Sequence, residues 1–126
     1  MTVLLDTDVI VDYLRGQPSA IAFVDGLSVQ PATSVVVVAE LYAGVRDGDE
    51  RAKLEALLFM TTVLPLSRAA AIEGGLYRRA FGKSHGSGLD DCLIAATSQI
   101  HGARLVTLNR KHFPMLADVL VPYAKS

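Results

Sequence analysis

The sequence predicts a three-layer α/β/α fold built on a mainly parallel central sheet. Short apolar runs that favour strands alternate along the chain with stretches of helical periodicity. This alternation is typical of a parallel sheet that is covered by helices on both faces. A chain of 126 residues has the length of one ordinary domain, and it contains no repeat or linker-like stretch. We therefore expect a single domain over residues 1–126.

The strands are predicted from runs of apolar and β-branched residues that end at turn-forming residues. Pro65 places the third strand near an edge or an end, because proline cannot donate a hydrogen bond to a neighbouring strand. The expected strands are 2–6, 29–33, 62–66, 104–108 and a short last one at 119–121.

Helices are predicted where apolar residues recur every three or four positions, and capping residues mark several of their ends. Pro18 opens the second helix, and Gly102 ends the last. Ser34 is expected to cap the third helix, although the four valines that follow it favour a strand. The expected helices are 8–14, 18–27, 34–45, 49–60, 67–81 and 89–101, with a loop at 82–88.

The composition narrows the functional class. Hydrophobic residues make up 51% of the chain, but no apolar run reaches the roughly 18 residues that a membrane span needs, and no secretory signal is expected. Cys92 is the one cysteine, so no internal disulfide is expected, which agrees with a cytoplasmic location. A net charge of −1 argues against a passive nucleic-acid binder. An enzyme that handles phosphates through a metal ion needs less positive surface.

Polar side chains lie at the ends of elements that meet at one edge of the predicted sheet. Asp6 ends the first strand, and Asn109 follows the fourth. Asp90 and Asp91 occupy the first turn of the last helix, and Glu40 lies early in the third. In an open α/β sheet, the carboxyl ends of the strands and the N-termini of the connecting helices share an edge, where ligands bind. The carboxylates would form a hard-oxygen site suited to Mg²⁺ or Mn²⁺.

Each of these acids also has a structural interpretation. Glu40 stands among small or apolar helical neighbours, where a carboxylate is costly unless it is paired or binds a metal ion. It could instead reach solvent at the helix edge or pair with Arg46. Asp6 and Asp8 could cap the helix that follows them, and we favour capping for Asp8. The acidic pair of the last helix would also interact favourably with the helix dipole.

Four motifs that contain these residues occur in an order typical of one known family and cover most of the chain. They are VLLDTDVIVDYLRG (3–16), SVVVVAELYAG (34–44), DCLIAATSQIHGARLVTLNRKHF (91–113) and VPY (121–123). In this combination the sequence resembles the PIN-domain family, and specifically the VapC-type toxins of bacterial toxin–antitoxin pairs.

The resemblance implies a metal-dependent endoribonuclease with Asp6, Glu40 and Asp91 as its three acids. The third acid follows from the family pattern Asp-x-x-Ile-Ala-Ala, which matches DCLIAA and makes Asp90 a neighbour of the ligand. The fourth position is often acidic in the family but is Asn109 here, so one firmly held Mg²⁺ or Mn²⁺ is expected. The asparagine would hydrogen-bond a phosphate or a water molecule.

Further residues are assigned supporting roles by the same resemblance. The acids would be supported by Asp8, Asp90, Thr107 and His112, the last of which stands where some relatives carry an acid. The candidates for contacts with RNA phosphates are Arg78, Arg79, Lys83, Arg110 and Lys111, although for any one of them a solvated helix or loop charge is the favoured explanation.

The resemblance also implies partners. Toxins of this type are held inactive by a VapB-type antitoxin, whose C-terminal segment covers an apolar groove, and they commonly form homodimers. DNA would be contacted only indirectly, through the antitoxin. Transfer RNA is the favoured substrate, with messenger and ribosomal RNA left open.

Three other functions were weighed. A phosphohydrolase of the haloacid dehalogenase type fits VLLDTDVI, but it would need a lysine that is missing between residues 84 and 110. A receiver domain of phosphorelay signalling fits the length, but the segment TVLPLS has no aspartate to accept a phosphoryl group. The last alternative is a degenerate PIN domain that only binds, and the retained acids argue against it.

Overall fold

The computed structural model describes residues 2–124, so the expected domain limits at 1 and 126 lie outside the described residues. Short strands alternate with helices along the chain. The elements are β1 (Val3–Leu5), α1 (Thr7–Leu14), α2 (Pro18–Asp25), β2 (Ala32–Ser34), α3 (Val35–Gly44), α4 (Asp49–Phe59), β3 (Thr62–Leu64), α5 (Arg68–His85), α6 (Leu89–Ile100), β4 (Arg104–Val106) and the short 3₁₀ helix η1 (Arg110–His112).

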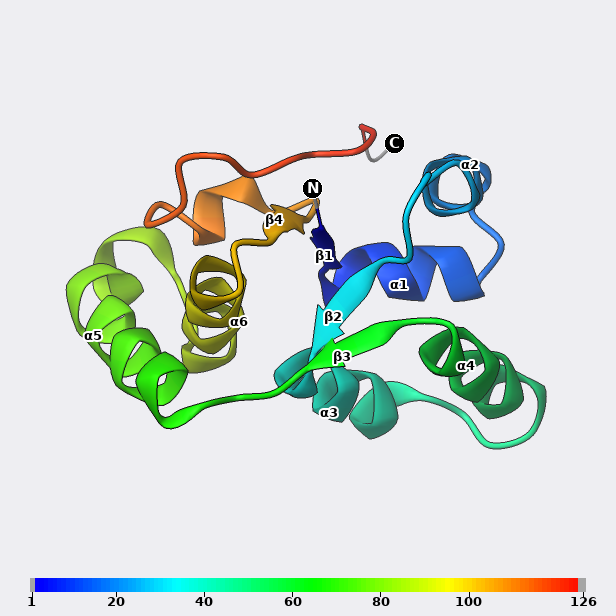
Figure 1. Ribbon diagram of the computed structural model, residues 1–126, viewed down its shortest axis with the longest axis horizontal. Helices are drawn as coiled ribbons and strands as arrows, with labels where there is room; N and C mark the ends of the chain where they lie inside the picture. The colour runs from blue at the N-terminus through cyan, green and yellow to red at the C-terminus, as the bar shows by residue number, and fades with distance from the viewer. Residues whose placement is uncertain (1, 125–126) are drawn as a thin grey trace.

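The strands form a four-stranded sheet in the order β3-β2-β1-β4, in which neighbouring strands pair in parallel. β3 lies at an edge, which is one of the two placements that Pro65 indicated. In Figure 1, α5 and α6 lie on one side of the sheet, and α1, α2 and α4 lie on the other. The predicted three-layer α/β/α fold with a parallel sheet is therefore confirmed.

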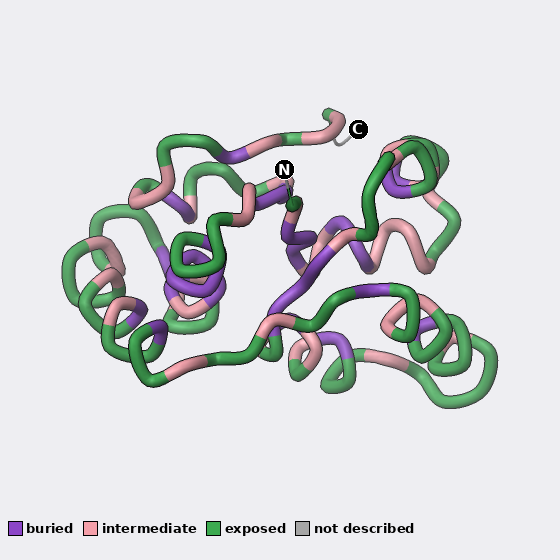
Figure 2. The backbone as a smooth tube through the Cα atoms, viewed as in Figure 1, coloured by how far each residue is buried: buried purple, intermediate pink, exposed green. Residues whose placement is uncertain are grey.

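The core is formed by the central strands and by α6, as the buried segments in Figure 2 show. Leu4, Ile94 and Leu105 are almost fully buried. Helix α5 packs closely against α6, because Gly74 has no side chain and a Cβ at this position would lie 2.7 Å from Leu93 Cδ2. The buried α6 provides a rigid base for the acidic residues in its first turn.

The valine-rich segment after β2 is helical, as predicted. The Ser34 hydroxyl accepts a hydrogen bond of 3.1 Å from the amide of Val37 and thereby caps α3. Val37 and Leu41 are buried on the same helix, so the burial of this face outweighs the preference of valine for strands. Within residues 2–124, none of the helices is both long and apolar enough to cross a membrane.

Two local predictions are wrong. The segment 82–85 was expected to be a loop but continues α5 to His85, and the helix ends at Gly86, whose φ of 65° is readily adopted only by glycine. The basic residues Lys83 and His85 lie in its last turn, where positive charge interacts favourably with the helix dipole. The segment 119–121 forms only an isolated parallel bridge between Leu120 and Val106.

Candidate active site

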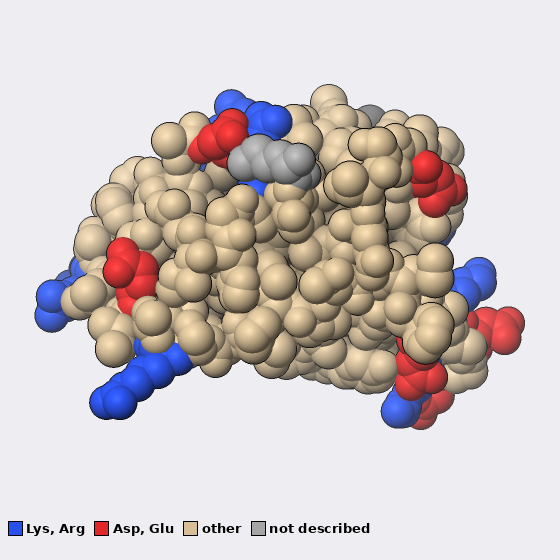
Figure 3. Space-filling model, in the orientation of Figure 1, with Lys and Arg blue, Asp and Glu red and all other residues tan. Residues whose placement is uncertain are grey.

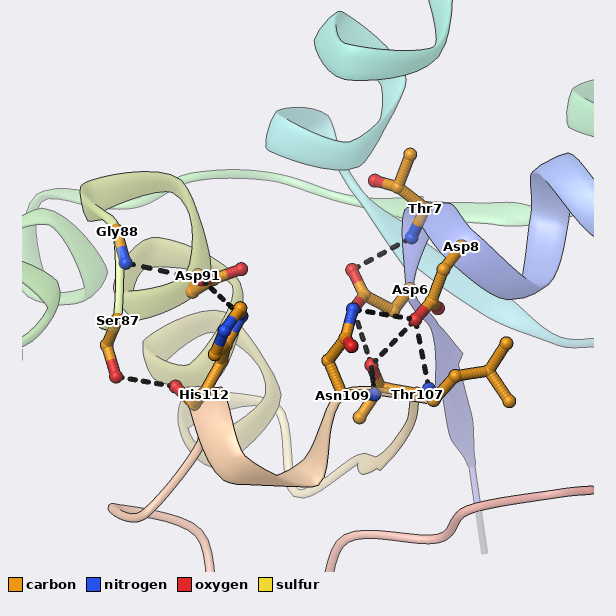
Figure 4. Close-up of polar contacts among 10 residues, drawn as sticks. Asp6, Thr7, Asp8, Ser87, Gly88, Asp91, Thr107, Asn109 and His112 are labelled. Carbon is orange, nitrogen blue, oxygen red and sulfur yellow. Dashed lines mark hydrogen bonds and ion pairs between the residues drawn. The ribbon is translucent and has the colours of Figure 1, made fainter. Parts of the chain in front are cut away.

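Asp6 and Thr107 lie side by side because β1 and β4 are neighbouring parallel strands. The register pairs Leu5 with Val106, and the Asp6 amide donates a hydrogen bond of 2.9 Å to the Val106 carbonyl. The next residue after each strand therefore lies at the same carboxyl edge of the sheet (Figure 4). The expected meeting of these chain segments is present in the structure.

The Asp6 carboxylate is buried and held from two sides. Oδ1 accepts a hydrogen bond of 2.8 Å from the Thr7 amide, and Oδ2 accepts one of 2.7 Å from the Thr107 hydroxyl. Only 6% of the residue is exposed. Burial and the nearby charge of Asp8 raise the pKa of Asp6 to about 7, against the opposite effect of these hydrogen bonds. Asp6 caps α1, so capping and a role in the site are compatible.

The N-cap of α1 is Asp6 and not Asp8, contrary to the interpretation favoured from the sequence, although Asp8 Oδ1 accepts a hydrogen bond of 2.8 Å from the Val9 amide in the first turn. Asp8 Oδ2 accepts hydrogen bonds from the Leu108 amide at 3.0 Å and from the side-chain amide of Asn109 at 3.3 Å. These contacts link the first turn of α1 to the loop after β4. The Asn109 side chain is therefore directed at Asp8 (Figure 4).

Glu40 reaches from α3 towards the start of α1. Its Oε1 accepts a hydrogen bond of 2.6 Å from the Thr7 hydroxyl, and its carboxyl group also contacts that of Asp90. Burial, followed by the contact with Asp90, raises the pKa of Glu40 to about 7, and the same contact lowers the pKa of Asp90. Arg46, the alternative partner, pairs with Glu50 at 3.1 Å.

Asp91 lies in the first turn of α6, and one of its two carboxylate oxygens is held. Oδ2 accepts a hydrogen bond of 3.2 Å from the Gly88 amide and lies 3.5 Å from His112 Nδ1. The Ser87 hydroxyl donates a hydrogen bond of 2.7 Å to the His112 carbonyl and so holds η1 against the start of α6. Burial raises the pKa of Asp91.

The acids influence one another across the edge of the sheet. The charge of Asp91 raises the pKa of Asp6, and the charge of Asp6 raises that of Glu40. In the described chain, no lysine or arginine forms an ion pair with any of the three. The histidine, cysteine and acidic side chains of residues 2–124 also include no group of three already close enough to hold a metal ion together.

The result is an open acidic cluster whose repulsion is relieved by protons or by a cation that draws the carboxylates together. Carboxylate oxygens are the ligands that Mg²⁺ and Mn²⁺ prefer in proteins. The carboxylates of Asp6, Glu40 and Asp91 are therefore suitable ligands for such an ion.

The predicted RNA contacts fall into two groups. Exposed on α5 are Arg78, Arg79 and Lys83. Both candidates on η1 are exposed, and the Arg110 guanidinium in addition donates a hydrogen bond of 3.2 Å to the Val119 carbonyl. Arg110 is therefore engaged in holding the C-terminal segment.

Two contributors to the site, Thr7 and Ser87, were missed from the sequence. Thr7 stands between two predicted site acids, and that position was the available signal. No signal in the sequence pointed to Ser87, because its partner His112 is 25 residues away and the two meet only in the fold.

Comparison with known proteins agrees with this arrangement. The family model described as the PIN domain matches residues 3–118. The chain is 40% identical over 125 residues to Ribonuclease VapC19 of Mycobacterium tuberculosis, a match that covers 95% of this chain and 98% of that protein.

Solved structures show the same fold. The toxin–antitoxin complex from Klebsiella pneumoniae matches with a TM-score of 0.84 at 24% identity, over 98% of this chain and 99% of that chain. VapBC2 from Rickettsia felis, bound to a DNA fragment from its promoter, matches with a TM-score of 0.77 at 26% identity, over 95% of this chain and 96% of that chain. The family match over nearly the whole chain, together with the acids at the carboxyl edge of a parallel sheet, shows that this protein belongs to the PIN-domain family.

Proposed function

We propose that this protein is a divalent-metal-dependent endoribonuclease that acts as the toxin of a VapBC-type toxin–antitoxin pair. The observation that carries the proposal is the convergence of Asp6, Glu40 and Asp91 at one edge of the sheet, with no lysine or arginine of the described chain paired to them. The relative VapC19 is named a ribonuclease, which supports RNA as the substrate. Membership of the PIN family argues against the phosphohydrolase and the receiver.

Asp6, Glu40 and Asp91 would hold one Mg²⁺ or Mn²⁺ firmly, because Asn109 offers no carboxylate at the fourth position. When bound, such an ion activates water for attack on a phosphodiester and offsets the charge that develops on the phosphoryl oxygens. The high pKa of Asp6 supports this assignment, since a buried carboxylate without a cation is driven to bind a proton.

The chain's own residues orient the acids and attract the substrate. Thr107 directs Asp6, and His112 with the Gly88 amide directs Asp91, so each carboxylate is held in one direction. Exposed cations such as Lys83 and Lys111 would contact RNA phosphates. We favour transfer RNA as the substrate and the cytoplasm as the location of the protein.

An apolar groove between α1, α2 and α4 supports the antitoxin as partner. Its volume is about 970 Å³, and its lining includes Leu14, Ile21, Leu57 and Met60, with Arg15 also on its wall. Arg15 borders a second, smaller hollow as well, which extends to Glu40. We infer that a segment of a VapB-type antitoxin occupies the groove and approaches the acidic site along this path. DNA would be contacted through the antitoxin.

The homodimer is supported by an apolar face outside this groove. Figure 3 shows a face whose centre is nearly free of charged residues, where β3 and the segment leading into α5 run in Figure 1. Val63 and Leu66 are 40% and 38% exposed, and Ile72 and Leu76, one turn apart on α5, are 58% and 44% exposed. Burial of such side chains against a second copy is favourable.

The proposed function is tested with the purified chain freed of antitoxin. It should cleave RNA in the presence of Mg²⁺ or Mn²⁺, and cleavage should stop when EDTA is added. Transfer RNA, messenger RNA and ribosomal RNA are compared as substrates. Asp6→Asn and Asp91→Asn should each abolish cleavage. The control is Asp49→Asn, since Asp49 is also an acid in a first helical turn, that of α4.

The proposal fails if cleavage persists in EDTA or if Asp91→Asn cleaves like the control. Loss of activity in Asp90→Asn with full activity in Asp91→Asn would show that the acids of α6 were assigned in the wrong order. A chain that binds RNA without cutting it under all these conditions would be the degenerate, binding-only PIN domain.

A further inference from the structure

Thr7 contacts two of the three site acids. It is the first residue of α1, and its backbone amide donates a hydrogen bond of 2.8 Å to Asp6 Oδ1. Its side-chain hydroxyl donates a hydrogen bond of 2.6 Å to Glu40 Oε1. One residue therefore links the acid at the end of β1 to the acid on α3.

Glu40 needs such a contact more than the other acids do. Glutamate has a longer and more flexible side chain than aspartate, and holding it in one conformation costs entropy. Asp6 and Asp91 each receive a hydrogen bond from a backbone amide. Among residues 2–124, the polar partners of Glu40 are the Thr7 hydroxyl and the carboxyl group of Asp90. Of these two, Thr7 is the donor that leaves the glutamate its negative charge.

The chemistry of the donor also matters. A lysine or arginine at this position would neutralise the carboxylate and compete with a cation, whereas a hydroxyl orients it and keeps its charge. The hydrogen bond from Thr7 engages Oε1, so this contact by itself leaves Oε2 to other partners at the edge of the sheet. A link that served only to join α1 to α3 would not need a charged acceptor.

We propose that Thr7 is a positioning residue that holds Glu40 in the conformation needed to bind a divalent cation. This inference rests on the proposed function, because it assumes that Glu40 is a ligand. Residues that orient the ligands of a metal ion typically change its affinity about 10- to 100-fold when they are removed.

The test compares Thr7→Val with Thr7→Ser in the full-length chain freed of antitoxin. Valine has nearly the shape of threonine and keeps the backbone amide that holds Asp6, so it removes only the hydroxyl. Serine restores the hydroxyl. The matched control is Thr61→Val, because the Thr61 hydroxyl donates to the Leu57 carbonyl of α4 at 2.7 Å and makes no contact with the site acids.

Binding of Mn²⁺ is measured by electron paramagnetic resonance, and RNA cleavage is measured as a function of Mg²⁺ concentration. We expect Thr7→Val to weaken Mn²⁺ binding about tenfold or more and to raise the half-saturating Mg²⁺ concentration in parallel. Thr7→Ser should return both values to within about threefold of the unmodified chain, and Thr61→Val should leave both unchanged. A crystal structure of Thr7→Val should show Glu40 turned away from α1.

The outcomes separate this inference from the proposed function. If the unmodified chain binds Mn²⁺ and Thr7→Val binds it equally well, the positioning role is wrong and the proposed function stands. The positioning role is also wrong if Thr7→Val is impaired and Thr7→Ser does not recover. If the unmodified chain binds no Mn²⁺ and cleaves no RNA, both proposals fail.

Discussion

Thr107 Oγ1 donates a hydrogen bond of 2.7 Å to Asp6 Oδ2 and thereby joins the carboxyl ends of β4 and β1. Both residues are buried, so neither group can replace its partner with bulk water. The Asn109 backbone amide donates to the same hydroxyl oxygen at 3.2 Å, and Asp8 Oδ2 lies 3.3 Å from it as a second, more distant acceptor. Because of the contact between Thr107 and Asp6, the stability of the fold depends on the Thr107 hydroxyl and on whether Asp6 is protonated.

Substitution of Thr107 by valine should destabilise the chain. The change removes the donor and leaves a buried carboxylate oxygen without a partner, at a cost of about 1–3 kcal/mol. The measurement is the free energy of unfolding in urea at pH 8 with EDTA. Thr97→Val is the control, because the Thr97 hydroxyl bonds the Leu93 carbonyl within α6. Equal losses in the two variants would contradict a special role for the contact with Asp6.

The stability of the metal-free chain should fall as the pH rises. The pKa of Asp6 is raised from 3.8 to about 7, and that of Glu40 from 4.5 to about 7. The folded chain therefore holds protons that the unfolded chain releases, and the stability present below pH 4 is lost as the pH rises through 7. For Asp6 alone we expect a loss of about 2–3 kcal/mol between pH 5 and pH 8.

This pH dependence is measured by urea unfolding in EDTA, and added Mg²⁺ should reduce it by replacing the protons. Asp6→Asn should also flatten the pH dependence, because an asparagine side chain does not titrate. The variant should still fold, since asparagine can cap α1. A stability that is constant or rises between pH 5 and pH 8 would show that Asp6 and Glu40 do not carry the raised pKa values.

Two adjacent glycines of α5 should respond in opposite ways to alanine. A Cβ at Gly74 would lie 2.7 Å from Leu93 Cδ2 and 3.1 Å from Leu93 Cα, whereas a Cβ at Gly75 would have nothing within 4 Å. Gly74→Ala should therefore lower the free energy of unfolding by about 1–3 kcal/mol. Gly75→Ala should raise it by up to about 1 kcal/mol, since alanine favours helix. Thermal and urea unfolding measure both, and a neutral Gly74→Ala would refute the close packing of α5 on α6.

Substitution of Arg110 should affect stability, whereas substitution of its neighbour Lys111 should affect RNA binding. Arg110→Ala removes a hydrogen bond to the Val119 carbonyl and should lower stability by about 0.5–1.5 kcal/mol. Lys111→Ala should leave stability unchanged, weaken RNA binding and reduce its dependence on salt by about one phosphate contact. Binding is measured by filter retention in the inactive Asp6→Asn chain, and thermal unfolding is measured in parallel. If Arg110→Ala has normal stability and its RNA binding depends less on salt, then Arg110 and not Lys111 is the residue that contacts a phosphate.

The sequence by itself determined the order of the elements, the parallel sheet and the edge at which the acids meet. These features follow from local periodicity, from capping residues such as Ser34, and from the general rule that strand ends and helix starts share an edge. The choice of Asp91 over Asp90 came from the family pattern alone. The structure is compatible with it, because Asp91 is the acid held by Gly88 and His112.

The tertiary structure decided which oxygen atoms are held and by which residues. The contacts of Thr7 with Glu40, of Thr107 with Asp6 and of Asn109 with Asp8 join residues that are 33 to 101 positions apart. The use of Arg110 to hold Val119 was likewise absent from any local pattern. Periodicity and capping report only on neighbours along the chain, whereas these contacts depend on strand order, register and helix packing, which exist only once the whole chain has folded.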